Sequence, residues 1–282
     1  MQLYPKRGGS RKTGWSTLFF RIFRSLGLLL PSLGIRERMR NRSIMIKTVI
    51  FDIDNTLYNF DKADQIAMDA VCAYAQEHLG WTKPEFSAIY ENMKKQLFGE
   101  LGDIGSSHNR LIRFEKILED HGLLLSPHAL NLYHRYWDTL IDVSEISPGA
   151  ARTLKALKDK GIRLGIGSDM TAWIQYKKLE KLELLTYFDF VVTSEEAGLD
   201  KPAPMFFNLC LKKAKCEPGE CLFIGDNYLK DYRGALAAGM QALWFVPAHL
   251  ESYAEKFEDS SAARIAALPE ILALPGLGLK ER

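Results

Sequence analysis

Several features that would place a chain outside the ordinary globular proteins are scarce or missing in this 282-residue sequence. It has four cysteines, too few for a small disulfide-stapled domain, and no glycine repeat of the collagen type. It contains no run of about 18 uncharged apolar residues, the length that crosses a bilayer. With 47% hydrophobic and 26% charged residues, the composition predicts a globular chain of one large or two modest domains.

A net positive charge is confined to the first 45 residues. Residues 1–45 hold ten lysines and arginines against one glutamate, a net charge of +9, so a chain total of +2 leaves −7 for the rest. An acidic body argues against nucleic acid as a partner. The basic segment could be a helix lying on anionic lipid or a targeting segment. We favour a disordered or upstream extension, with Met45 starting the folded protein.

The cysteines indicate the redox compartment. Cys72, Cys210, Cys216 and Cys221 match no common zinc-binding spacing. Buried, reduced thiols are therefore expected, as is usual in a cytoplasmic protein. We expect the protein to be a monomer or a homodimer.

From residue 46 onward, short apolar runs alternate with helical patterns. The runs rich in β-branched or aromatic residues are expected to form strands, at 48–51, 163–167, 188–192, 221–224 and 241–245. Helical patterns follow at 148–160, 172–182, 204–215, 229–238 and near 263–273. This alternation predicts an α/β fold, a Rossmann-like parallel sheet with helices on both faces.

The segment between the first two strands differs from the other connections. Residues 58–147 contain no convincing strand and show helical periodicity at 62–79, 84–98, 107–121 and 126–140. This length is too great for a simple crossover. It predicts a separate all-helical domain inserted into a core made of residues 46–57 and 148–282.

Polar side chains follow four of the predicted strands. They are Asp52 and Asp54 after the first strand, Ser168 and Asp169 after the second, Lys201 after the third, and Asp226, Asn227 and Asp231 after the fourth. The carboxyl ends of parallel strands meet at one edge of the sheet, where ligands bind. Each residue alone could be a helix cap, a turn former or a surface residue. Their joint occurrence in this order favours one catalytic crevice.

The chemistry of the expected cluster is restrictive. Asp52, Asp54 and Asp226 would repel one another unless a cation lay between them, and hard carboxylate oxygens select Mg2+. A metal-held carboxylate stays ionised and can attack phosphorus, while a second carboxyl protonates the leaving oxygen and later activates water. Ser168 would donate a hydrogen bond to a phosphoryl oxygen, and Lys201 would balance its charge.

Four segments together resemble the haloacid dehalogenase-like (HAD) hydrolase superfamily. They are FDIDNTL at 51–57, GSD at 167–169, KPAPMF at 201–206 and GDNYLKD at 225–231. The resemblance covers residues 46 to about 250, and the helical insert looks like the cap of the phosphoglycolate phosphatase-like branch. It implies an enzyme, a phosphatase acting on a small phosphomonoester.

The resemblance also implies a role for each motif residue. Asp52 would be the nucleophile that forms an aspartyl-phosphate and binds Mg2+, and Asp54 the general acid and base whose backbone carbonyl binds the metal. Ser168 and Lys201 would bind the phosphoryl group, and Asp226 would be a metal ligand.

The remaining motif residues would not bind the metal directly but would support the residues that do. Asp231 would bind it through water or pair with Lys201, and Asn227 would support the site nearby. Asp169 departs from the family, which more often has Asn or Gly there. We expect its carboxylate to turn away from phosphate and only its backbone N–H to face the ligand.

The resemblance leaves the substrate open. Asp54 favours phosphoryl transfer, because the dehalogenases lack this second acid. The sequence around the first three of these segments, including VTSEEAG at 192–198, is similar to that of HAD-type pyrimidine 5′-nucleotidases. This similarity suggests a nucleoside 5′-monophosphate as the substrate. Alternatives are a sugar- or acid-phosphate phosphatase of the phosphoglycolate type, a phosphomutase, and a catalytically idle, membrane-tethered binding module. The expected specificity residues, in or near the cap, are Asn59, Phe60, His108, Arg110 and Arg113.

Overall fold

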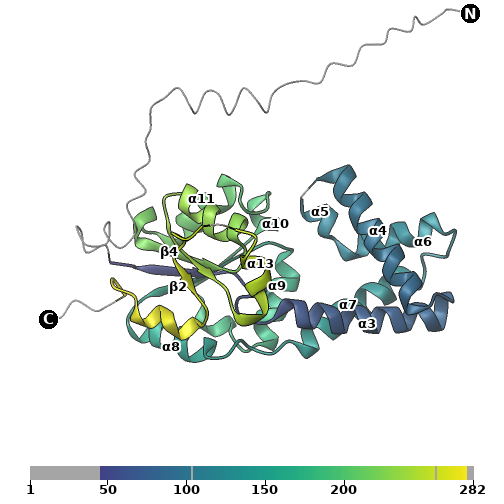
Figure 1. Ribbon diagram of the computed structural model, residues 1–282, viewed down its shortest axis with the longest axis horizontal. Coiled ribbons are helices and arrows are strands. Elements are labelled where there is room, and N and C mark those ends of the chain that lie inside the picture. The colour runs from purple at the N-terminus through teal and green to yellow at the C-terminus, as the bar shows by residue number, and fades with distance from the viewer. Residues whose placement is uncertain (1–44, 103, 258, 278–282) are drawn as a thin grey trace, which may run out of the picture.

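The computed structural model describes residues 45–102, 104–257 and 259–277, and in them a six-stranded parallel sheet forms the core (Figure 1). The strand order is β3-β2-β1-β4-β5-β6. The strands are β1 (Thr48–Phe51), β2 (Arg163–Ser168), β3 (Phe190–Thr193), β4 (Cys221–Gly225), β5 (Gln241–Phe245) and β6 (Arg264–Ile265). The predicted α/β fold is thereby confirmed.

Alternate residues of the strands pack into two separate hydrophobic cores, because successive side chains point to opposite faces of a sheet. In β1, Val49 and Phe51 join one core, whereas Ile50 joins the other. The first core includes α8 (Ala150–Asp159), α9 (Ala172–Lys181) and η5 (Leu268–Ala273), and the second includes α11 (Pro204–Ala214), η3 (Tyr228–Arg233) and α12 (Gly234–Ala237). Both faces of the sheet are thus covered.

Shorter elements complete the core. They are η1 (Leu185–Tyr187), α10 (Ser194–Ala197), η2 (Pro218–Glu220), η4 (Ala248–Leu250) and α13 (Glu251–Ala254).

Among the described residues between β1 and α8, five helices extend to one side of the sheet (Figure 1). They are α3 (Phe60–Leu79), α4 (Lys83–Leu101), α5 (Gly105–His108), α6 (Arg110–Asp120) and α7 (His128–Val143). The long helices α3 and α7 pack side by side, and α4 and α6 pack together next to them. We call α3 to α7 the helical insert; its status as a separate domain stays a prediction.

Local sequence fixes where the helices of the insert begin and end. Asn59 caps α3 by accepting a hydrogen bond from the backbone N–H of Lys62, and Gly80 ends it with a left-handed backbone that glycine adopts without strain. The two connections to the core run together, since Ser147 donates its backbone N–H to the carbonyl oxygen of Leu57 at 2.7 Å.

The C-terminal segment differs from the sequence prediction of a helix near 263–273. Residues 264 and 265 form β6, because the backbone around them pairs with β5: Trp244 donates to Ala263 and Val246 donates to Ile265. The helical part is reduced to the 3₁₀ turn η5, with a proline in its first turn. That part of the prediction was wrong.

Within the described residues, no helix is both long enough and apolar enough to cross a bilayer. The lipid-binding, targeting and upstream-extension interpretations of residues 1–45 fall on a segment that lies, except for Met45, outside the described residues.

Candidate active site

The strand order places the acidic residues that follow β1 and β4 next to each other. The chain runs from β1 through β2 to β3 on one side, then returns to β4 on the other side of β1. Phe51 pairs with Ile224, and the backbone N–H of Asp52 donates to the carbonyl oxygen of Ile224 at 2.8 Å. Such a reversal opens a crevice at the carboxyl ends of the strands, the usual ligand site of open α/β sheets.

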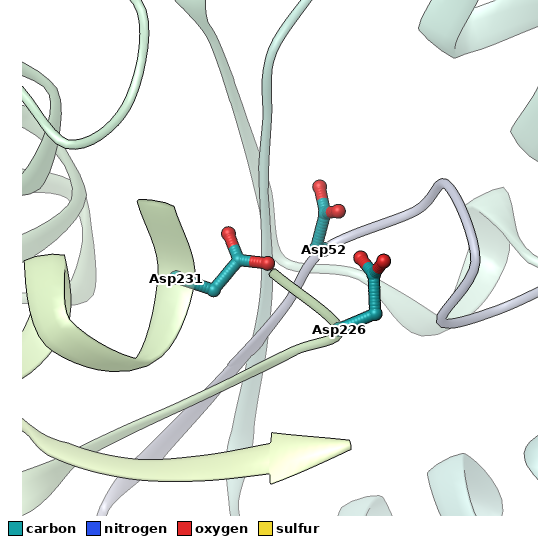
Figure 2. A group of neighbouring side chains, drawn as sticks. All are labelled: Asp52, Asp226 and Asp231. Carbon is teal, nitrogen blue, oxygen red and sulfur yellow. The ribbon is translucent and has the colours of Figure 1, made fainter. Parts of the chain in front are cut away.

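Three carboxylates converge at this reversal (Figure 2). Asp52, Asp226 and Asp231 each present an oxygen within 4.8 Å of the others. Asp231 comes from η3 and approaches past Gly225, where an added Cβ would lie 2.2 Å from its Oδ2, so only glycine leaves the needed space. Asp231 Oδ1 accepts a hydrogen bond from Lys201 Nζ at 2.7 Å, and Oδ2 accepts one from the Asn227 backbone N–H.

The partners of Asp231 separate it from the other two acids. Both of its oxygens are engaged by groups of the chain, which favours its predicted role as the partner of Lys201. Asn227 caps η3 by accepting from the N–H groups of Leu229 and Lys230. It therefore supports the loop that carries Asp226 and the helix that carries Asp231.

The acidic cluster is short of positive charge. Burial raises the pKa of Asp226 well above its ordinary value, and repulsion from Asp231 and Asp52 raises it further. Burial also raises the pKa of Asp52, against the lowering effects of Lys201 and the Ser168 hydroxyl. The pKa of Asp231 rises to about 6, again through burial.

An unmet hydrogen-bonding capacity marks the same place. Lys201 Nζ lies 2.9 Å from Asp52 Oδ1, but it directs hydrogen bonds to Asp231 and to the carbonyl oxygen of Gly167, and Asp52 Oδ1 has no hydrogen-bond partner in the described part of the chain. Hard, crowded carboxylate oxygens with raised pKa values fit a divalent cation such as Mg2+.

Lys201 is a buried cation beside the acidic cluster. Burial lowers its pKa, but the carboxylates of Asp231, Asp52 and Asp169 outweigh burial and raise the pKa well above the ordinary value. The ammonium therefore stays charged. Asp169 also holds the Lys201 loop, because its Oδ1 accepts from the Lys201 backbone N–H at 2.9 Å while its Oδ2 lies 3.3 Å from Lys230 Nζ. The carboxylate of Asp169 is thus paired with the chain; the ligand-facing role of its backbone N–H stays a prediction.

Asp54 has a partner that the sequence analysis missed. Lys178 from α9 places its Nζ 2.6 Å from Asp54 Oδ1, and the Tyr58 hydroxyl donates to the same oxygen at 2.6 Å. Burial raises the pKa of Asp54, but the Lys178 ammonium and the hydrogen bonds from Lys178 and Tyr58 outweigh it and leave the pKa below its ordinary value. Asp54 is therefore ionised in this state of the site.

Lys178 and Gln175 lie three positions apart on the buried face of α9. Both side chains are fully buried. Gln175 Nε2 donates to Ser168 Oγ at 2.8 Å and to the Asp169 carbonyl oxygen at 2.7 Å. The signal in the sequence was a lysine and a glutamine between Ile174 and Leu179, at positions where an amphipathic helix normally has apolar residues.

A cavity of about 980 Å³ lies between the sheet edge and the helical insert. Asp54, Asp169 and Lys201 line it from the core. From the insert, three of the expected specificity residues line it: Phe60, His108 and Arg110. Arg110 is anchored as well, because it donates to the Tyr136 hydroxyl and to the His108 carbonyl oxygen.

Comparison with known proteins agrees with this geometry. The family model described as haloacid dehalogenase-like hydrolase matches residues 46–239. The chain belongs to this family. It is 34% identical over 221 residues to ribulose-1,5-bisphosphate 5-phosphatase of Halopiger xanaduensis, which covers 77% of this chain and 92% of that protein.

Two further relatives extend the comparison. Glyceraldehyde 3-phosphate phosphatase of Methanopyrus kandleri is 33% identical over 70% of this chain and 82% of its own length. The crystal structure of a HAD phosphatase from Thermococcus onnurineus superposes with a TM-score of 0.63 at 26% identity, covering 83% of this chain and 99% of that one.

Two expected specificity residues of this HAD hydrolase lie away from the cavity lining. Arg113 is 2% exposed and donates to the Tyr90 hydroxyl and the Ser107 carbonyl oxygen, so it holds the helical insert together. Arg113 lies one helical turn after Arg110 in α6. Its side chain points into the packed interior of the insert, whereas that of Arg110 reaches the cavity. Asn59 caps α3 and lines a second cavity of about 400 Å³, next to the chain segment that leads from α7 back to the core. Neither residue lines the larger cavity, and the specificity roles expected of Arg113 and Asn59 stay predictions that its lining does not support.

Mg2+ is expected to protect this HAD hydrolase against heat more at about pH 7.5 than at about pH 5. The folded-state pKa values of Asp226 and Asp231 are raised. Without metal, the stability tied to these groups is complete below their ordinary pKa of about 4 and is lost as the pH rises through the raised values. A bound cation offsets that loss, whereas protons displace the cation at low pH.

Thermal melts in EDTA and in Mg2+ at both pH values measure this effect. Asp226→Asn should melt higher than wild type in EDTA at the higher pH and should lose most of the Mg2+ shift. Asp142→Asn, at a side chain that is 82% exposed, is the matched control. An equal Mg2+ shift in Asp226→Asn and wild type would contradict the metal site.

Proposed function

We propose that this HAD hydrolase is a Mg2+-dependent phosphatase that removes the phosphoryl group of a small phosphorylated sugar through an aspartyl-phosphate on Asp52. The observation that carries the proposal is a second acid, Asp54, two residues beyond Asp52 at the edge where Lys201 and the acidic cluster meet. A phosphate ester needs this acid to protonate its leaving oxygen, whereas displacement of a halide does not.

Asp52 supplies the nucleophilic oxygen in this proposal. A bond forms between its carboxylate and phosphorus while the bond from phosphorus to the ester oxygen breaks. The Lys201 ammonium, 2.9 Å from Asp52 Oδ1, offsets the negative charge of the attacking carboxylate and of the phosphoryl oxygens. The Ser168 hydroxyl at the end of β2 donates to a phosphoryl oxygen.

Asp54 moves the protons. It gives a proton to the departing ester oxygen, then takes one from the water that attacks the aspartyl-phosphate, which releases inorganic phosphate and restores Asp52. The low pKa of Asp54 before substrate binds is suited to the second task. A phosphate dianion bound beside Asp54 raises that pKa through like-charge repulsion and so supplies the proton for the first task.

Asp52, Asp226 and the backbone carbonyl of Asp54 would hold the Mg2+. When bound, the ion would neutralise the acidic cluster and withdraw charge from a phosphoryl oxygen. Asp231 would hold the Lys201 ammonium in place through the hydrogen bond that its Oδ1 accepts.

The relatives support a sugar phosphate as the substrate. Their names state activity on ribulose 1,5-bisphosphate and glyceraldehyde 3-phosphate. These comparisons do not support the nucleotidase alternative, and phosphatase relatives over most of the chain argue against an idle binding module. The cavity combines Arg110 and His108 with the rings of Phe60 and Trp137, a lining that suits an anionic, partly apolar metabolite. Cysteines that are free within the described residues support the proposed cytoplasmic location.

A release assay tests the function. Wild-type protein with Mg2+ is offered ribulose 1,5-bisphosphate, glyceraldehyde 3-phosphate, phosphoglycolate, pyrimidine 5′-monophosphates and a 2-chloro acid. We expect phosphate release with the highest kcat/KM for a sugar phosphate, lost in EDTA, and no chloride release. A nucleotide as the best substrate would overturn the substrate class, and chloride release without phosphate release would overturn the reaction.

A further inference from the structure

Gln175 is a buried polar residue of α9 that lies behind the phosphate-binding loop. It is fully buried and is not among the residues that line the cavity, so its effect on a substrate must pass through a neighbour. Its two hydrogen-bond partners are Ser168 Oγ and the carbonyl oxygen of Asp169, the adjacent residues at the carboxyl end of β2.

The orientation of the Gln175 carboxamide follows from its partners. The Asp169 carbonyl oxygen only accepts hydrogen bonds, so the carboxamide atom 2.7 Å from it must be the nitrogen. The same nitrogen lies 2.8 Å from Ser168 Oγ and has hydrogens to give but no lone pair to offer. Ser168 Oγ is therefore the acceptor of this bond.

This bond determines where the Ser168 hydrogen can go. A serine hydroxyl has a single hydrogen, and an amide nitrogen cannot accept it. The hydrogen is therefore directed away from Gln175, and the Ser168 hydroxyl is one of the groups that lower the pKa of the nearby Asp52 carboxyl. A phosphoryl group bound at Asp52 would lie in the same direction.

The other end of the carboxamide shows that this orientation carries a cost. Gln175 Oε1 is buried and has no hydrogen-bond partner among the residues described. A buried unpaired acceptor lowers stability. The unpaired Oε1 is thus the cost of an orientation in which Nε2 donates hydrogen bonds to both Ser168 and Asp169.

We infer that Gln175 is a positioning residue that fixes the Ser168 hydroxyl as a hydrogen-bond donor to the phosphoryl group. The role rests on the proposed phosphatase function. It requires no contact between Gln175 and the substrate.

A double-mutant cycle tests the role. Gln175→Met and Ser168→Ala are made singly and together, and kcat, KM and the inhibition constant of inorganic phosphate are measured with Mg2+. Ser168→Ala should lower kcat/KM by roughly 100-fold. Gln175→Met should lower it by about tenfold and weaken phosphate inhibition. In the Ser168→Ala background the same change should cost less than about twofold.

The possible outcomes separate the two proposals. If Gln175→Met costs the same factor in both backgrounds, or nothing in wild type, the positioning role is overturned while the phosphatase stands. If wild type releases no phosphate from any substrate, the proposed function fails and the role fails with it. Gln241→Met is the matched control, because Gln241 Nε2 also donates to a backbone carbonyl, that of Gly219, at the opposite edge of the sheet.

Gln175→Glu provides a second test if Gln175→Met does not fold. A carboxylate at this position accepts a hydrogen bond, so the Ser168 hydrogen would turn toward residue 175. The loss in kcat/KM should be larger in wild type than in Ser168→Ala, where only the added charge acts. Equal losses in the two backgrounds would overturn the role.

Discussion

Asp52→Asn is expected to lower kcat by roughly four to six orders of magnitude and to leave the fold intact. The amide keeps the shape of the carboxylate but lacks the negative oxygen that attacks phosphorus. Lys201 keeps its hydrogen bonds to Asp231 and to the Gly167 carbonyl oxygen, so the buried ammonium is not left alone. Because burial raises the pKa of Asp52, its ionisation costs stability, and the melting temperature near neutral pH should stay level or rise.

Phosphate release and thermal melting measure the two parts of this prediction. Beryllium fluoride with Mg2+, which mimics an acyl phosphate, gives a third readout: it should raise the melting temperature of wild type and not of Asp52→Asn. Asp142→Asn is the exposed control. Activity of Asp52→Asn within about tenfold of wild type would show that another group is the nucleophile.

The residues that follow the strands could be predicted from the sequence because geometry brings them together. In a parallel sheet each crossover returns to the same edge, so Asp52, Ser168 and Asp226 had to converge once the strands were recognised. The pairing of Asp231 with Lys201 was one of the two roles that the family resemblance implied for Asp231.

The helix residues of the site could not be predicted in this way. Whether Gln175 and Lys178 face the acids depends on the rotation of α9 about its own axis, which its packing against the sheet and against α7 decides. The same holds for Arg110 and Arg113, whose different fates depend on how α6 packs on α4. The strand β6 was missed because two residues are too few to show a pattern.

Lys178→Met is expected to lower kcat by roughly 100-fold near neutral pH and to move the acid limb of the pH–rate profile to higher pH. In wild type the Lys178 ammonium outweighs burial and holds the pKa of Asp54 below its ordinary value. Methionine fills a similar volume but leaves burial unopposed, so the pKa of Asp54 rises. Asp54 then stays protonated to higher pH and cannot take a proton from the attacking water until that pH is passed.

The same substitution separates the charge of Lys178 from its packing. Its Nζ lies 5.6 Å from the ring centroids of Tyr58 and Phe60 and 5.5 Å from that of Trp137, so the side chain also joins the core to the helical insert. Lys178→Arg keeps the charge and should keep the acid limb close to that of wild type, even where the larger head group lowers kcat. Lys177→Met, at a 43% exposed side chain next in sequence, should leave the profile unchanged. If Lys178→Met lowers kcat equally at every pH, packing alone accounts for the residue, and Asp54 owes its proton affinity to other neighbours.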